Sequence, residues 1–318
     1  MDRLEAMAIL LRVVQAGSLS EAARQLGMSL ATVSRRLSEL ETHLQAQVLN
    51  RSSRRLSMTD AGRLYVEACR RILEQVEEAE RSIVGVYKEA KGRLTVTAPL
   101  VFGRVHVIPV VSEFLKEYPD IDLKLILADR LLDMLENNID VAVRIGDLAD
   151  SSLVATRVGA VRRVVCAGVT YLERHGRPDR PEDLQDHTCV TFDNLASPDA
   201  WRFAGRKSDE IVVPIRSRLT VTTAEAALEA VIGGLGFGCL LSYQISESRR
   251  AGLVDIVLEN FERPAWPVSV LHLGQENPPR RLRAFLDFVM PRLRARLSEE
   301  EALFLARTGD VGTATMPA

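Results

Sequence analysis

Apolar residues near the start of the chain recur every three or four positions, which is the period of an α-helix rather than of a β-strand. This spacing predicts a helix over residues 4–15, a second that stops at Gly27, and a third that Ser29 caps and that runs to about residue 44. The third helix carries a single apolar stripe, made of Val33, Leu37, Leu40 and Leu44. Such a stripe packs on a core, so the opposite side of this helix is expected to face solvent.

The next segment, VLNRSSRRLSMTDAG at residues 48–62, leans toward β-structure with polar residues at its centre, which predicts a small two-stranded wing. From Thr59 a long helix is expected to run to about residue 91, with apolar positions spaced as in a coiled-coil seam. Because no neighbouring segment could cover that seam, we expect a second copy of the chain to do so. The predicted dimerisation residues are Ile72, Val76, Ala79 and Ile83.

At Gly92 the pattern changes, and strand-like segments begin to alternate with helical ones. The expected strands are RLTVTAP, IDLKLILA and IDVAVRI, and the helices between them are VIPVVSEFLKEYP and LLDMLENN. The alternation restarts at RRVVCAGV and ends in the strand PVSVLHLG and a last helix, RRLRAFLDFVMPRLRARL. This order predicts two α/β lobes with mostly parallel sheets, and a cleft between two lobes is a common ligand site.

The 318 residues are 47% hydrophobic and 26% charged, which is typical of a globular chain with room for more than one domain. Acidic and basic residues nearly cancel, 43 against 41, so only local charge can indicate a partner. No apolar run approaches the roughly 20 residues of a membrane helix, and the N-terminal run is amphipathic, unlike a secretory leader. Four scattered cysteines lack metal-ligand or CxxC spacing. We therefore expect a cytoplasmic protein with reduced thiols, no metal site and no membrane contact.

Residues 19–41, LSEAARQLGMSLATVSRRLSELE, place two short helices around a glycine turn, the arrangement of a helix-turn-helix. From Arg24 to Arg55 the chain holds six arginines and two glutamates, a local charge of +4 (6 − 2) in a chain of net charge −2. Such a basic patch suits phosphates, and a polar helix edge suits the major groove, although a solvated helix face would look similar. The predicted DNA-binding residues are Ser29, Leu30, Thr32, Ser34, Arg35 and Arg36 on the helix and Arg51, Arg54 and Arg55 on the wing.

The segment LLRVVQAGSLSEAARQLGMSLATVSRRLSELE, followed by the wing, the long helix and the two lobes, resembles the LysR-type transcriptional regulators over about residues 3–297. The resemblance implies an α+β multidomain chain: a winged helix-turn-helix, a linker helix that pairs two chains, and a regulatory domain similar to type 2 periplasmic binding proteins. It implies a homodimer or homotetramer on a pseudo-palindromic operator, with RNA polymerase as a further partner. Where many relatives have Gln-Pro in the recognition helix, this chain has Leu30 and Ala31, and Leu30 could touch a thymine methyl.

On this basis each part of the chain receives an expected role. The expected parts are a DNA-binding domain at 1–62, a linker and dimerisation helix at 63–91, a regulatory domain at 92–297, and a flexible tail at 298–318. Within the regulatory domain, lobe I is expected to comprise about 92–162 and 268–297, and lobe II about 163–267.

The resemblance also implies a small-molecule effector, of unknown identity, bound between the lobes, and no other cofactor. The predicted effector-binding residues are Leu100, Phe102, Arg144, Asp147, Asp193, Asn194, Thr222 and Thr223. Leu100 and Phe102 stand where many relatives place a hydroxyl, which favours an apolar or aromatic effector unless both simply pack in a core. Thr222 and Thr223 could hold an anion or cap a helix, and Arg144 and Asp147 could be pocket charges or a hinge ion pair.

No motif of the chain predicts catalysis. GGLGFG at residues 233–238 follows a helix and precedes a strand, so we interpret it as a turn rather than a phosphate loop. The five histidines are isolated, without a nucleophile or acidic pair at useful spacing, so no catalytic residue is predicted and an enzyme is disfavoured. The alternative from another class is a solute-binding or transport-associated protein, against which the basic N-terminal domain argues.

Overall fold

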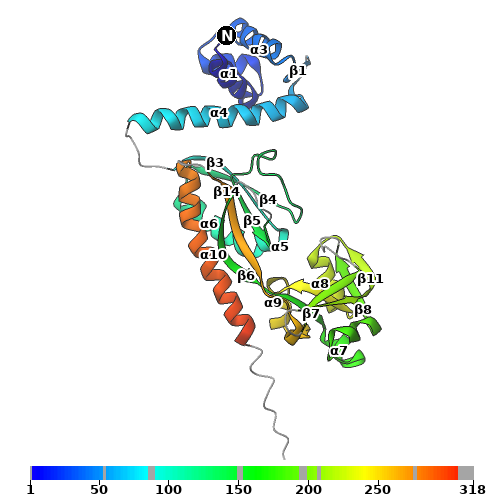
Figure 1. Cartoon of the computed structure of the whole chain (residues 1–318). Helices are drawn as coiled ribbons and strands as arrows, with labels where there is room; N and C mark the ends of the chain where they lie inside the picture. The colour runs from blue at the N-terminus through cyan, green and yellow to red at the C-terminus, as the bar shows by residue number, and fades with distance from the viewer. Residues whose placement is uncertain are drawn as a thin grey trace, which may run out of the picture. The chain divides into compact units, whose positions relative to one another are not determined.

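The computed structural model describes residues 2–52, 55–84, 90–148, 153–192, 199–205, 209–274 and 278–306, in two compact units, residues 1–89 and 90–318. Figure 1 shows both units with their helices and strands labelled. Unit 1 contains α1 (Arg3–Ala16), α2 (Leu19–Leu26), α3 (Leu30–Leu44), β1 (Leu49–Ser52), β2 (Arg55–Met58) and α4 (Asp60–Val84).

Short polar residues and glycines set the ends of the first three helices. Asp2, Ser18 and Ser29 each accept a hydrogen bond from a backbone N–H of the first turn that follows, which satisfies amides that have no partner inside the helix. Gly17 and Gly27 end α1 and α2 with φ of +71° and +65°, a conformation that favours glycine. The helices then bury their apolar faces together in one core, beneath which α4 runs (Figure 1).

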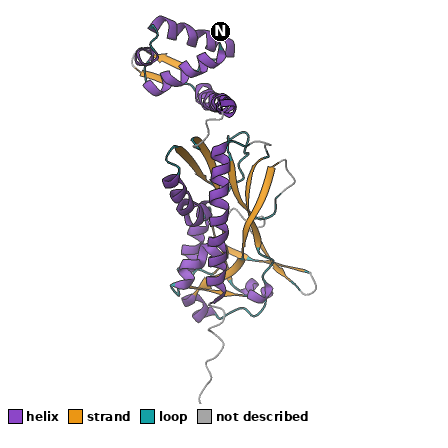
Figure 2. Ribbon diagram, turned by 90° about the vertical axis from the view of Figure 1, so that its left-hand side faces the viewer, coloured by secondary structure: helices purple, strands orange, loops and turns teal. Residues whose placement is uncertain are grey.

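Unit 2 begins with lobe I, which is built on a five-stranded sheet of order β4-β3-β5-β14-β6. Its elements are β3 (Gly92–Ala98), α5 (Leu100–Phe102), the π-helical turn η1 (Gly103–Val107), α6 (Ile108–Glu117), β4 (Ile121–Leu127), β5 (Val141–Ile145), β6 (Leu153–Val161), β14 (Trp266–Leu273) and α10 (Arg280–Ala306). Helices α6 and α10 cover one face of this sheet, as Figure 2 shows in purple against orange.

Lobe II has a second five-stranded sheet, of order β11-β8-β12-β7-β13, and a two-stranded hairpin of β9 and β10. Its elements are β7 (Arg163–Gly168), α7 (Val169–His175), the 3-10 helix η2 (Pro181–Asp186), β8 (Thr188–Phe192), β9 (Ala200–Ala204), β10 (Glu210–Pro214), β11 (Arg216–Val221), α8 (Ala224–Ile232), β12 (Phe237–Leu241), α9 (Ser242–Arg250), β13 (Val254–Val257) and the 3-10 helix η4 (Glu259–Phe261).

The two-lobed α/β architecture matches the expectation, but the sheets are mixed rather than mostly parallel. In each sheet two of the four strand pairings are parallel and two are antiparallel. The antiparallel pairings involve the strands that carry the chain between the lobes, β6 and β14 in one sheet and β7 and β13 in the other. Consecutive parallel strands need a crossover connection between them. A strand that enters from the other lobe has no such connection and can therefore pair in the antiparallel direction.

Two expected local structures are wrong. The segment LLDMLENN at residues 131–138 forms turns rather than a helix, with Met134 buried and Leu131 and Leu135 exposed. The last helix does not end at Leu297, because α10 continues to Ala306 and residues 298–306 are therefore no flexible tail. The extension is held by Phe304, which is 5% exposed.

Phe304 binds α10 to lobe II through two arginines. The guanidinium groups of Arg162 and Arg249 lie 4.9 Å and 4.6 Å from the centre of its ring, and Arg249 Nη1 donates a hydrogen bond of 3.1 Å to the carbonyl oxygen of Phe304. One hydrophobic core joins both lobes, and it includes the contact of Phe102 from lobe I with Tyr243 from lobe II. In the described part of the chain, no helix combines the length and the apolar character that crossing a bilayer requires.

We expect Phe304→Ala to lower the free energy of unfolding of unit 2 by about 3 kcal/mol, because it removes a buried aromatic ring and both cation–π contacts. Leu303→Ala is the matched control, since Leu303 is 60% exposed and its loss should have little effect. Urea unfolding followed by tryptophan fluorescence measures this directly, because Trp201 and Trp266 both lie in unit 2. Equal stability of the two variants would contradict the role given to Phe304.

Candidate nucleic-acid interface and ligand site

Helix α3 is a two-faced helix fixed at its N-terminus. The Ser29 hydroxyl accepts a hydrogen bond of 3.1 Å from the N–H of Thr32 and lies 2.8 Å from the Thr32 hydroxyl. Val33, Leu37 and Leu40 are fully buried in the core of unit 1. With these residues seated, the opposite face of α3 is exposed to solvent.

The two adjacent arginines of α3 have different surroundings. The side chain of Arg35 is 67% exposed, and its nearest carboxylate is that of Glu39 at 3.9 Å. The side chain of Arg36 is only 26% exposed, because it turns toward α1 and pairs with Glu5 at 3.1 Å and with Glu39 at 3.5 Å. The expectation that Arg36 faces outward is therefore wrong: at 100° per residue it lies beside the buried stripe.

Three exposed positions of α3 were missed by the sequence reasoning. Ala31, Ser38 and Thr42 lie at i−4, i+3 and i+7 from Arg35 and are exposed, so they share its face. The helical spacing places them on the face of Arg35, but they are neither arginines nor, apart from Ala31, close to the glycine turn, the two features that marked the other predicted residues. Leu30 is 52% exposed at the start of this face, which is costly for a leucine without a partner.

The wing is attached to the far end of α3. Glu41 accepts hydrogen bonds from the backbone N–H groups of Val48 and Leu49, at 3.0 Å and 3.2 Å, so its charge is used to anchor β1. Strands β1 and β2 pair antiparallel, with Ser52 opposite Arg55 at the tip and Arg51 opposite Leu56. Arg51 and Arg55 are thus carried by the hairpin, whereas Arg54 lies outside the described residues.

The predicted dimerisation residues lie on α4, and those whose side chains are described are at least partly exposed to solvent. Ile72 is 36% exposed, Val76 is half-buried, and Leu64 on the same helix is 74% exposed. The side chains of Ala79 and Ile83 lie outside the described part of the helix.

In unit 2 the predicted ligand residues do not all point into one cavity. Phe102 is completely buried, with its ring 4.6 Å from that of His106 and 5.4 Å from that of Tyr243. It is a core residue that joins the lobes, so its assignment to the effector site is wrong. Leu100 is half-buried, and its N–H donates a hydrogen bond of 2.9 Å to Asp129.

The charged candidates of lobe I differ strongly in burial. Arg144 is 7% exposed on β5, where it lies opposite Ser269, and its Nη2 has no hydrogen-bond partner. Burial lowers the pKa of Arg144, because desolvation disfavours the charged form. Asp147 follows Gly146 and is exposed. Among the described residues no carboxylate forms an ion pair with the buried Arg144, which makes it a stronger candidate than Asp147 for binding an anionic ligand.

In lobe II the threonines have separate roles. Thr223 caps α8, since its hydroxyl accepts a hydrogen bond of 3.2 Å from the N–H of Ala226, whereas Thr222 is exposed. The first turn of α8 reaches lobe I through an ion pair of 3.9 Å between Glu225 and Arg104. Asp193 and Asn194 lie outside the described residues.

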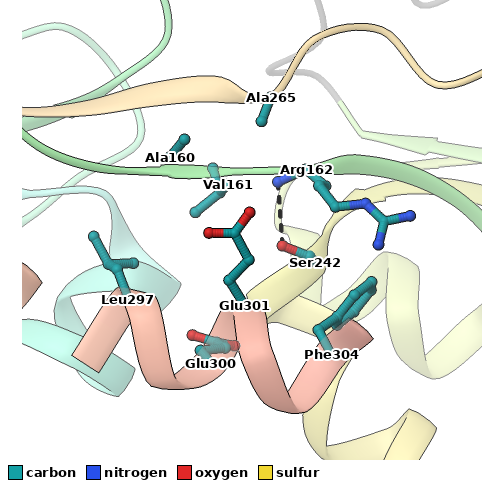
Figure 3. A pocket seen from close by; sticks show the side chains of 9 residues that line it. All are labelled: Ala160, Val161, Arg162, Ser242, Ala265, Leu297, Glu300, Glu301 and Phe304. Atoms are coloured by element: carbon teal, nitrogen blue, oxygen red, sulfur yellow. Dashed lines mark hydrogen bonds between the residues drawn. The ribbon is translucent and has the colours of Figure 1, made fainter. Parts of the chain in front are cut away.

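The lobes are also joined where the chain crosses from β6 to β7. Arg162 donates from its backbone N–H to the Ser242 hydroxyl at 3.2 Å and forms two hydrogen bonds of 2.7 Å with Glu262. Figure 3 shows the last turns of α10 beneath this crossing, with Phe304 near Arg162. The narrow crevice that remains there is lined by Ala160, Val161, Arg162, Ser242, Ala265, Leu297, Glu300, Glu301 and Phe304. A change in lobe orientation must therefore alter these contacts.

Two family models match the chain. Residues 4–63 match the bacterial regulatory helix-turn-helix protein, lysR family, and residues 88–294 match the LysR substrate binding domain. An HTH-type transcriptional regulator of Xanthomonas campestris is 34% identical over 288 residues, 90% of this chain and 84% of the relative. The transcriptional activator AaeR of Escherichia coli is 30% identical, over 90% of this chain and 93% of the relative.

Solved structures give the same result. Full-length AphB, a virulence activator of Vibrio cholerae, has a TM-score of 0.58 at 26% identity, covering 91% of this chain and 99% of the AphB chain. CrgA of Neisseria meningitidis, a LysR-type transcriptional regulator, has a TM-score of 0.58 at 29% identity, covering 91% of this chain and 98% of the CrgA chain.

We expect Arg35→Ala to impair DNA binding and Arg36→Ala to impair stability. Arg35→Ala should weaken binding to a labelled DNA duplex by about tenfold and reduce the salt dependence by about one phosphate contact, with unchanged thermal stability. Arg36→Ala should lower the melting temperature, because it leaves Glu5 without its partner. Fluorescence anisotropy over a series of salt concentrations, with thermal unfolding of each variant, measures both. Unchanged anisotropy curves for Arg35→Ala would remove that residue from the interface.

Proposed function

Because the chain belongs to the LysR family of bacterial transcriptional regulators, we propose that the outer face of α3 reads an operator while a ligand in unit 2 controls how firmly the protein holds it. The chain is a DNA-binding transcriptional regulator with a helix-turn-helix domain and an effector-binding domain.

The exposed face of α3 is suited to the major groove. Arg35 offers a long cationic side chain that is 67% exposed and only distantly paired with Glu39, at 3.9 Å, and Ser38 and Thr42 add hydroxyls along the same face. The exposed Leu30 at the N-terminal end of the helix provides an apolar contact for a thymine methyl. The wing arginines Arg51, Arg54 and Arg55 would contact phosphates beside the groove.

Pairing of two α4 helices would place two helix-turn-helix domains on one DNA duplex. Leu64 and Ile72 are exposed apolar residues on a helix whose remaining surface is rich in charge, and burying them against a second copy removes apolar area from water. A two-fold dimer reads a pseudo-palindromic operator, and two dimers would form a tetramer.

The effector would act on the equilibrium between lobe orientations. Thr222, Leu100 and the buried Arg144 are the residues through which we propose that it binds between the lobes. A ligand shifts such an equilibrium only by its difference in affinity for the two arrangements. We further propose a cytoplasmic protein without catalytic activity and without a cofactor other than the effector, and with RNA polymerase as a partner at the promoter.

The observation that carries the proposal is the exposed Arg35 on the face of α3 opposite the fully buried Val33, Leu37 and Leu40. Its test is a nuclease footprint of the purified chain on the DNA beside its own gene, since regulators of this family often control a neighbour. We expect a protected region with dyad symmetry that disappears as salt is raised. Absence of any protection at low ionic strength would contradict the proposal.

The dimer helix has a separate test. Ile72→Asp should produce monomers, because it places a charge in the apolar seam, and should lose the footprint over both half-sites together. Gln75→Asp is the matched control, since it adds the same charge at an exposed polar position of α4. Light scattering coupled to gel filtration gives the mass of each variant. A dimeric mass for Ile72→Asp would show that the chains pair elsewhere.

A further inference from the structure

The base of the wing, residues 47–49, connects the end of α3 to strand β1. Val48 and Leu49 are 1% and 2% exposed and belong to the core of unit 1. The strands that follow, β1 and β2, form a two-stranded sheet, and a hairpin of this size is marginally stable in water by itself. The contacts at the base therefore decide where the wing lies relative to α3.

On the side of α4 the base is held by Thr59. The Thr59 hydroxyl donates a hydrogen bond of 2.6 Å to the carbonyl oxygen of Gln47 and accepts one of 2.9 Å from the N–H of Gly62. The N–H of Thr59 donates to the carbonyl oxygen of Val48 at 3.1 Å. A Cβ on Gly62 would overlap that same carbonyl oxygen, so the start of α4 lies directly against the base.

On the side of α3 the base is held by one carboxylate. Glu41 Oε1 accepts the N–H groups of both Val48 and Leu49, and both hydrogen bonds are partly buried. Glu41 follows Arg35 by six residues on α3, which is about 9 Å along the helix axis. Without the carboxylate the two N–H groups lose their acceptor, and the base has to move to reach water.

We propose that Glu41 is a positioning residue for DNA binding, which sets the place where the wing arginines Arg51, Arg54 and Arg55 meet the DNA backbone. This inference rests on the proposed function, in which α3 lies in the major groove and the wing contacts phosphates. Glu41 acts through the backbone of residues 48 and 49 and needs no contact with DNA. Because phosphate contacts fix the register of a protein on a duplex, a displaced wing also disturbs the fit of α3.

The positioning role predicts an effect opposite in sign to that of charge alone. A carboxylate in a DNA-binding domain repels phosphates, so its removal strengthens binding if only its charge matters. If Glu41 holds the wing, its removal weakens binding, because the wing and α3 no longer reach the duplex together. The sign of the change therefore separates a positioning residue from a surface charge.

Glu41→Ala should weaken binding to the DNA beside the protein's own gene at least about tenfold and reduce the salt dependence by at least about one phosphate contact. Glu41→Gln keeps an oxygen acceptor at the same reach and should retain more of the affinity. Glu39→Gln is the matched control, since it removes the same charge from the same helix, where Glu39 pairs with Arg35 and Arg36 rather than with the wing base. It should bind as tightly as the wild type or more tightly.

Fluorescence anisotropy of a labelled duplex over a series of salt concentrations gives the affinity and the salt dependence of each variant. Affinity of Glu41→Ala equal to or above that of the wild type, with an unchanged salt dependence, would overturn the proposal.

A double-mutant cycle separates positioning from a general loss of stability. In a variant with Arg51, Arg54 and Arg55 all replaced by alanine, adding Glu41→Ala should no longer weaken binding at low ionic strength, because no wing arginine remains to be positioned. In an Arg35→Ala background the same change should still weaken binding about as much as in the wild type. An equal loss in both backgrounds would show that the effect does not pass through the wing and would overturn the proposal.

Circular dichroism and thermal unfolding establish that each variant is folded. If Glu41→Ala is not, Glu41→Gln takes its place and should bind more weakly than Glu39→Gln, whereas equal binding of these two variants would contradict the positioning role. A wild-type chain that binds no duplex would contradict the proposed function itself. A wild-type chain that binds, together with a folded Glu41→Ala of unchanged affinity and salt dependence, would contradict only the role of Glu41.

Discussion

The hydrophobic contact of three fully buried side chains, Val33, Leu37 and Leu40, with the core of unit 1 holds α3 in place. It fixes the rotation of α3 about its axis, and that rotation decides which side chains can reach a groove. A turn of one residue would exchange Arg35 for Arg36 and direct a structural ion pair at the DNA. Specificity in such a helix therefore begins with a hydrophobic contact that never touches DNA.

The regulatory unit uses an analogous contact for a different purpose. Phe304, at the end of a helix that starts in lobe I, is held by Arg162 at the crossing and by Arg249 of lobe II. The π-faces and the carbonyl oxygen supply these two cations with partners that carry no formal charge. These contacts connect α10 to lobe II in one defined geometry. A ligand that changes the orientation of the lobes has to break or shift them.

The arginines of the described residues differ in whether a carboxylate neutralises them. Arg36 and Arg202 each have a close carboxylate and support the fold. Arg144 is different: it is buried in lobe I, its Nη2 has no hydrogen-bond partner, and no carboxylate of the described residues forms an ion pair with it. An anion adds most binding energy where a buried cation has no counter-charge, which is why Arg144 is the proposed contact for an acidic effector.

What the sequence by itself determined was local. Interactions within a few residues determine the caps at Ser18 and Ser29, the glycine turn, the apolar stripe of α3 and the alternation of strands and helices. Together with the family resemblance, these features predicted the order of the domains. Only the tertiary structure decided that Phe102 packs against Tyr243, that Arg36 turns to Glu5, and that α10 continues to Phe304. These contacts join residues far apart in the chain, and spacing carries no information about which distant side chain will fill a given space or neutralise a given charge.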